Sequence, residues 1–170
     1  MLQSLDVDLS WKAGDLVSFL PIILALVFFI LYWFTAASPR VKSYFYDKYT
    51  FDEASFRHIF FTKIFGFLSM GVFPIILCLI FLKGFSLSDY GLVYIEQTTI
   101  YSILWTLGLS LLVIPLVHFS ARKPKNLLNY PQIRAKIWTR KMVYMNALGW
   151  FLYLFGYEFL FRGVLLFPLI

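Results

Sequence analysis

The chain has 170 residues, of which 61% are hydrophobic and 21% aromatic, and 14% carry a charged side chain, against about 25% in an ordinary soluble domain. Its apolar residues lie in blocks longer than the helices of globular proteins, so the composition argues against a soluble domain and for a membrane protein. The formal net charge of +6 matters through where the basic residues lie along the chain, because basic residues in membrane proteins report orientation. We therefore expect no nucleic-acid partner.

Four apolar segments are predicted to be membrane helices, at about residues 17–37, 60–82, 100–119 and 146–170. At 1.5 Å per residue, about 20 residues cross the roughly 30 Å hydrocarbon core of a lipid bilayer. Lys63 is the one charge in the second segment, and it lies close enough to the segment's end for its ammonium to reach the interface. The fold class is therefore all-α, a polytopic transmembrane helical protein with about four membrane segments.

Basic side chains alternate along the chain: one precedes the first span, five lie in the following connection and the adjoining end of the second span, one precedes the third span and seven precede the fourth. This positive-inside pattern predicts a multi-pass protein of the plasma membrane, which we expect to be bacterial, with the N-terminus outside and both basic loops in the cytoplasm. Binding of anionic lipids by the last loop stays open as an alternative. After Pro124 and Pro131 that loop is predicted to form a basic interfacial helix leading into the fourth span.

The fourth span contains the stretch GYEFLFRG, residues 156–163. A charge at the centre of a bilayer costs about 2.5–3.5 kcal/mol, but the i,i+4 spacing of Glu158 and Arg162 favours an ion pair. Tyr157 projects about 100° away, toward a neighbouring face. The flanking Gly156 and Gly163 would let another helix approach closely. The pair is interpreted either as a structural link between helices or as a functional site.

GYEFLFRG resembles the first motif of the CPBP family of intramembrane proteases, which includes the type II CAAX prenyl endopeptidases and the bacterial Abi proteins. The family motif is EExxxR, commonly within GEExxFRG, and Glu158 and Arg162 match its second Glu and its Arg. The resemblance covers about the first half of a family member. It implies a membrane endopeptidase that hydrolyses a peptide or prenylated-protein substrate, with Glu158, Arg162 and Tyr157 as the catalytic candidates.

The chain departs from the family in two places. Tyr157 stands where the family has its first Glu, and a phenol cannot serve as a carboxylate base at neutral pH. The family's later histidine motifs are not in this chain: His58 and His118 both precede the first motif and are interpreted as interfacial side chains. Because the chain also ends in an apolar run, we expect a truncated part of a larger bundle, with a C-terminal half missing and no protease activity in this fragment.

Several interpretations stay open. The residues identify no cofactor, and the use of a divalent metal by the full-length family member is undecided. A non-catalytic membrane protein of the same fold, such as an immunity or scaffolding factor, would use the ion pair structurally. A transporter fragment would have Glu158 and Arg162 along its substrate path. A longer reading frame would separate these interpretations, because later histidines support hydrolysis and an inverted repeat supports transport.

The predicted topology can be tested by cysteine labelling from the outer side of the membrane. A cysteine placed at Ser4 should be modified, and one placed at Asn126 should be spared, because the alternation of basic residues puts these positions on opposite sides. Labelling at both positions, or the reverse pattern, would contradict this topology.

Overall fold

The computed structural model describes residues 10–12 and 14–166, which form helices and connecting loops without a strand. Four helices in this part of the chain are long and apolar enough to cross a membrane, which confirms the all-α class and the four apolar segments. The first is α1 (Asp15–Ala37) and the third is α5 (Glu96–Ala121). The second is one continuous helix made of α3 (Phe51–Phe67), η1 (Leu68–Val72) and α4 (Phe73–Phe81). The fourth is α7 (Arg140–Glu158) with its extension η3 (Phe159–Leu166).

The helix bounds differ from the predicted spans mainly at the ends. The second helix begins at Phe51 rather than near Phe60, and the fourth begins at Arg140, where the side chain of Thr139 caps it by accepting a hydrogen bond from the backbone N–H of Met142 at 3.2 Å. The last four residues of the predicted fourth span lie outside the described residues.

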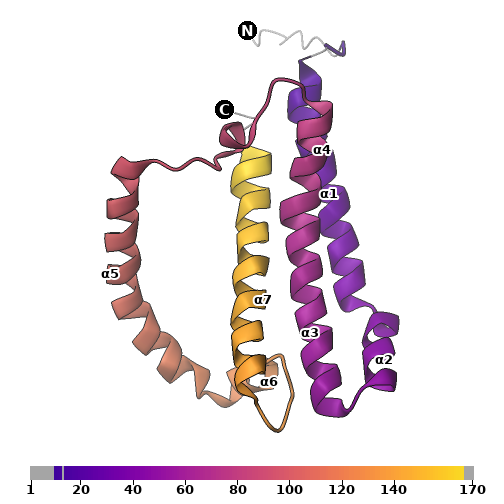
Figure 1. Cartoon of the computed structure of the whole chain (residues 1–170), viewed down its shortest axis with the longest axis vertical. Coiled ribbons are helices and arrows are strands. Elements are labelled where there is room, and N and C mark those ends of the chain that lie inside the picture. The colour runs from indigo at the N-terminus through magenta and orange to yellow at the C-terminus, as the bar shows by residue number, and fades with distance from the viewer. Residues whose placement is uncertain (1–9, 13, 167–170) are drawn as a thin grey trace, which may run out of the picture.

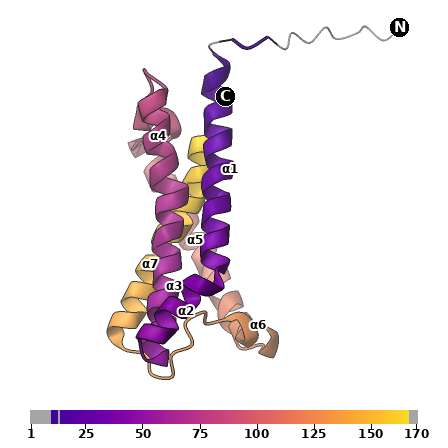
Figure 2. The same ribbon diagram turned by 90° about the vertical axis from the view of Figure 1, so that its right-hand side faces the viewer.

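Three of the long helices form a bundle, in which α1, the helix α3–η1–α4 and α7–η3 lie side by side (Figures 1 and 2). The buried core lies in the half of the bundle that contains α4 and η3. It includes Ala25 of α1, Met70 and Cys78 of the second helix, and Leu160 and Val164 of η3. Because these side chains come from all three helices, the core fixes how they pack in this half.

Glycines form the contact between α7–η3 and the second helix. Gly149 and Gly156, seven residues apart, are both buried on the face of α7 that meets the second helix. Gly163, in η3, is also buried, but a Cβ atom added there would meet the ring of Phe159 and the carbonyl of Tyr90 instead. A Cβ atom added to Gly156 would lie 3.0 Å from the Cα atom of Phe67, and one added to Gly71 would lie 3.1 Å from the Cα atom of Gly156. The two helices therefore cross with their backbones in contact, as the small residues around the motif predict.

The two basic loops lie at the same end of the bundle (Figure 1). The first contains α2 (Pro39–Lys48), a helix that the sequence analysis did not predict. Ser38 begins it by accepting a hydrogen bond from the backbone N–H of Val41 at 3.4 Å, and Pro39 has the fixed φ angle that suits a first helical turn. The second basic loop contains the short helix α6 (Pro124–Asn129).

The prediction of an interfacial helix after Pro131 is wrong, because the segment between α6 and α7 is not helical. Its backbone is bound to the start of α3 instead. The Asp52 carboxylate accepts hydrogen bonds from the backbone N–H of Lys136, at 3.1 Å, and of the next residue, at 3.2 Å. The Ser55 hydroxyl accepts one from the backbone N–H of Arg134 at 2.7 Å. These side chains satisfy the donors that a helix would have paired internally.

The helix α5 stands apart from the bundle. None of its residues is buried, and it packs mainly on α6, which follows it. Figure 1 shows it separated from α7 along most of its length and joined to the bundle by the loops at its two ends. The apolar side chains on every face of α5 are therefore available to lipid or to other protein segments.

The glycine contact gives a test with an internal control. Gly156→Ala should lower the free energy of unfolding by about 1–3 kcal/mol, because the added methyl group meets backbone atoms that cannot move aside. Gly108→Ala in α5, where nothing lies within 4 Å of an added Cβ, should cost nothing and should stabilise the helix by up to about 1 kcal/mol. Thermal unfolding in detergent measures both. Equal effects of the two changes would show that the helices do not touch at Gly156.

Candidate functional site

The motif GYEFLFRG lies where α7 changes from an α-helix to the π-helix η3. Glu158 is the last residue of α7, and Arg162 lies in η3. The guanidinium Nε of Arg162 is 2.7 Å from the carboxylate Oε2 of Glu158, so the predicted ion pair is formed. The exposed fraction of the side chain is 79% for Arg162 and 52% for Glu158. The pair therefore lies on the outer surface of the described bundle rather than between its helices.

The direction of the pair follows from the glycine contact. Glu158 lies about 200° around the helix from Gly156 at 100° per residue, and Gly156 faces the second helix. The carboxylate thus points away from the helix that α7 packs on. Among the described residues the carboxylate is paired with Arg162 alone, through Oε2, so Oε1 remains able to accept a hydrogen bond from water or from another segment.

Tyr157 lies on a different face from the ion pair. Its ring centroid is 4.8 Å from that of Phe161 and 6.5 Å from that of Tyr153. Together with Tyr153, it lines a surface pocket against α1, whose lining includes Phe29 and Tyr32. The structure therefore brings Glu158 and Arg162 together and places Tyr157 with the aromatic side chains between α7 and α1.

Both helices that cross at the glycines contain a π-helical stretch. In the second helix this is η1, and Pro74 follows it with no N–H to donate to the carbonyl of Met70. In the fourth helix it is η3, which begins directly after Glu158. The two stretches contact each other. Single π-helical turns inside α-helices occur frequently at functional sites. η1 is such a turn, and η3, the longer stretch that it contacts, contains Arg162.

The two histidines are not part of this site. His58 lies on α3, buried against the rings of Phe45 and Tyr46 at centroid distances of 5.9 and 6.4 Å. It is 13 residues before Gly71, which corresponds to about 20 Å along the helix. His118 is exposed near the end of α5 that leads to α6. Neither side chain is placed to assist Glu158.

The described residues do not form a metal site. No three side chains of His, Cys, Asp or Glu among them come close enough to share an ion. Glu158 has Arg162 as its neighbour rather than a second ligand.

Lys63 is a buried cation whose place the sequence analysis did not predict. Only 5% of the residue is exposed, so the expectation that its ammonium reaches the interface is wrong. Its Nζ atom lies 3.3 Å from the ring centroid of Trp150 and 4.4 Å from that of Tyr153. Among the described residues, no carboxylate forms a salt bridge with Lys63. The aromatic faces supply the compensating interaction, and Gly149 makes room for the stem of the lysine.

Comparison with known proteins identifies no relative: no family model, no curated protein and no solved structure matches the chain. The fold and the site define an all-helical protein with four helices that could cross a membrane and an ion pair on the exposed face of the last one.

The ion pair can be tested by comparing single and double substitutions. Arg162→Met should lower stability by about 2.5–3.5 kcal/mol if the helix is in the bilayer, because it leaves the Glu158 carboxylate uncompensated there. The double substitution Glu158→Met and Arg162→Met should be close to neutral. Expression level and thermal unfolding in detergent or nanodiscs provide the measurement.

A second i,i+4 pair in the same chain is the control. Glu53 and Arg57 are 2.8 Å apart on the first turns of α3, with side chains 44% and 46% exposed. Removing Arg57 should have little effect, because an exposed pair in water contributes little. If Arg162→Met is as harmless as Arg57→Met, the Glu158 carboxylate does not lie in a hydrophobic environment.

Proposed function

We propose that the chain is inserted in a membrane through its four long helices and contributes the Glu–Arg motif of a CPBP-type intramembrane endopeptidase. The observation that supports this proposal is the ion pair of Glu158 and Arg162 at the start of a π-helical segment. Ionisable side chains within membrane helices are costly, and they are typical of functional sites. The resemblance of GYEFLFRG to the family's first motif supplies the reaction class.

In this proposal Glu158 positions and activates a water molecule. Arg162 holds Oε2, which fixes the orientation of the carboxylate, while Oε1 accepts a hydrogen bond from the water. Attack on a peptide carbonyl requires the carboxylate to take the proton of that water. It also requires donors that stabilise the developing oxyanion. Tyr157 faces α1 and is not oriented toward the same water.

The remaining catalytic groups come from segments that pack on the exposed face of α7. The carboxylate points away from the second helix, and α5 leaves it open, because the Glu158 side chain is about half exposed. Further membrane spans carrying histidines would meet Glu158 on this face. The proposed substrate is a peptide or a prenylated protein that reaches the site from the membrane.

A non-catalytic protein of the same fold is the second candidate. The observation that favours it is that the Glu158–Arg162 pair is complete in itself, while a tyrosine occupies the position of the family's first carboxylate. In that case the pair would serve to bind a partner helix rather than to activate water.

Activity measurements distinguish the two candidates. The 170-residue chain alone, reconstituted in liposomes, should not cleave a peptide or prenylated-peptide substrate, because neither of its histidines lies near Glu158. In a longer chain that carries histidines on later spans, Glu158→Gln should abolish turnover, because it removes the carboxylate that takes the proton of the water.

The control for that experiment is Glu53→Gln, which removes a carboxylate on the same fold far from the motif. It should leave turnover unchanged. Cleavage by the 170-residue chain that survives Glu158→Gln would show that the chemistry does not belong to this motif, and a longer chain with no activity in any variant would favour the non-catalytic candidate.

A further inference from the structure

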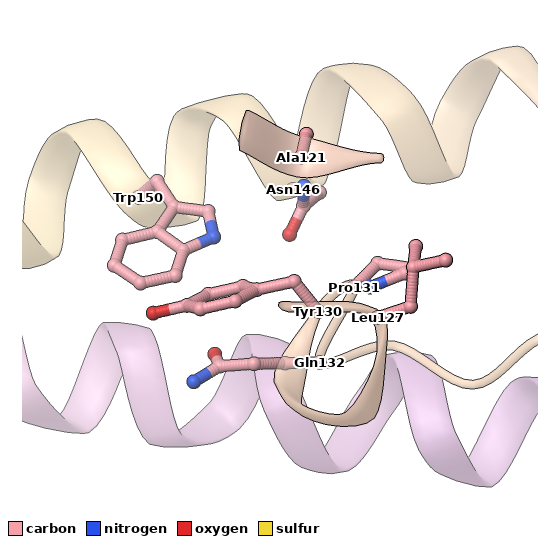
Figure 3. Close-up of a pocket in the computed structure, with 7 residues that line it drawn as sticks. All are labelled: Ala121, Leu127, Tyr130, Pro131, Gln132, Asn146 and Trp150. Carbon is pink, nitrogen blue, oxygen red and sulfur yellow. The ribbon is translucent and has the colours of Figure 1, made fainter. Parts of the chain in front are cut away.

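A pocket lies between the end of α5, the loop after α6 and the first half of α7 (Figure 3). Its volume is about 280 Å³, slightly below the range of whole-ligand sites, which begins near 300 Å³. The pocket is therefore large enough for the polar headgroup of a larger molecule but not for the whole molecule. Four of its lining side chains carry hydrogen-bonding groups: Tyr130, Gln132, Asn146 and Trp150.

None of these four side chains forms a hydrogen bond within the described part of the chain, although Gln132, Asn146 and Trp150 are half-buried. In Figure 3 the indole nitrogen of Trp150 and the carboxamide of Asn146 lie on one side of the Tyr130 ring, and the carboxamide of Gln132 lies on the other. Their polar atoms are not among the buried unpaired atoms of the described residues, so they are accessible to a ligand. Together the four residues offer N–H and O–H donors to a ligand that accepts several hydrogen bonds.

The charges around the pocket favour an anion. Arg122 and Lys123 directly follow the lining residue Ala121, and Lys125 precedes the lining residue Leu127 by two positions. The buried ammonium of Lys63 contacts the ring of Trp150, so it shares one side chain with the pocket. No acidic residue is among the lining residues. A ligand with a phosphate group would combine acceptor oxygens with the complementary charge.

We propose that this pocket binds the headgroup phosphate of an anionic phospholipid. The pocket lies at the end of the bundle where both basic loops are found (Figure 1), and Trp and Tyr side chains are enriched at the membrane–water interface. The apolar helix α5, with none of its residues buried, extends from the pocket and offers a surface for the acyl chains. Clusters of basic residues next to membrane helices, such as the one in the second basic loop, attract such headgroups. The inference rests on the proposed membrane insertion and not on the proposed hydrolysis.

The test is lipid binding by the purified 170-residue chain in a mild detergent, measured by native mass spectrometry with phosphatidylglycerol or phosphatidylcholine added. One phosphatidylglycerol per chain should be retained at least about tenfold more tightly than phosphatidylcholine. The double variant Gln132→Leu and Asn146→Leu should weaken that binding by roughly tenfold or more, and Tyr130→Phe by roughly threefold, as expected from losing one or more hydrogen bonds.

Two control variants isolate the pocket. Asn129→Leu changes an exposed amide next to the pocket, and Arg40→Gln removes a cation from the other basic loop; both should bind phosphatidylglycerol like the unchanged chain. Thermal unfolding reports whether the double variant folds. If it does not, Tyr130→Phe carries the test, because it removes one hydroxyl from an exposed ring.

The inference is overturned by unchanged phosphatidylglycerol binding in the folded pocket variants, or by equal binding of the two lipids. It is also overturned if inorganic phosphate occupies the pocket and the chain retains no lipid, since the ligand is then a soluble anion. Extraction of the chain from membranes by alkaline carbonate would contradict membrane insertion itself. A chain that resists extraction but lacks the lipid preference would contradict the lipid site alone.

Discussion

The backbone contact between the second and fourth long helices is the constraint on which the rest of the structure depends. Because Gly71 and Gly156 carry no side chain, the helices approach until main-chain atoms touch, and this contact sets the rotation of α7 about its axis. Once that rotation is set, Lys63 faces the aromatic side chains of α7, and Glu158 faces outward. The glycine contact thus accounts for both the burial of the Lys63 cation and the exposure of the Glu158–Arg162 ion pair.

Hydropathy and spacing predict much of this arrangement from the sequence. The four apolar helices follow from the length of the apolar blocks, and the Glu158–Arg162 pair follows from i,i+4 spacing, because both depend on neighbours along the chain. The predicted interfacial helix fails because Asp52, far away in sequence, accepts the backbone N–H of Lys136. The prediction that the Lys63 ammonium reaches the interface fails for the same reason, since its aromatic partners lie on α7. Local patterns do not reveal which distant side chain will satisfy a donor or a charge.

The bundle is unequal along its length and around its circumference. The half that contains α4 and η3 has a core of buried side chains from three helices, whereas the other half is held by aromatic contacts, the Lys63 cage and the loop bound to Asp52. Around the circumference, the face of α7 that carries Glu158 is open, and α5 lies beyond it without burying a residue. The proposed reaction and the proposed lipid site both use surfaces that this uneven packing leaves exposed.

The aromatic cage of Lys63 also has a consequence for the order of assembly. During synthesis α3 is made before α7, so at that stage the ammonium has neither Trp150 nor Tyr153 beside it. Until then its flexible stem can keep the charge in water. Docking of α7 is therefore the step at which the lysine loses its hydration, and this later helix converts a surface cation into an interior one.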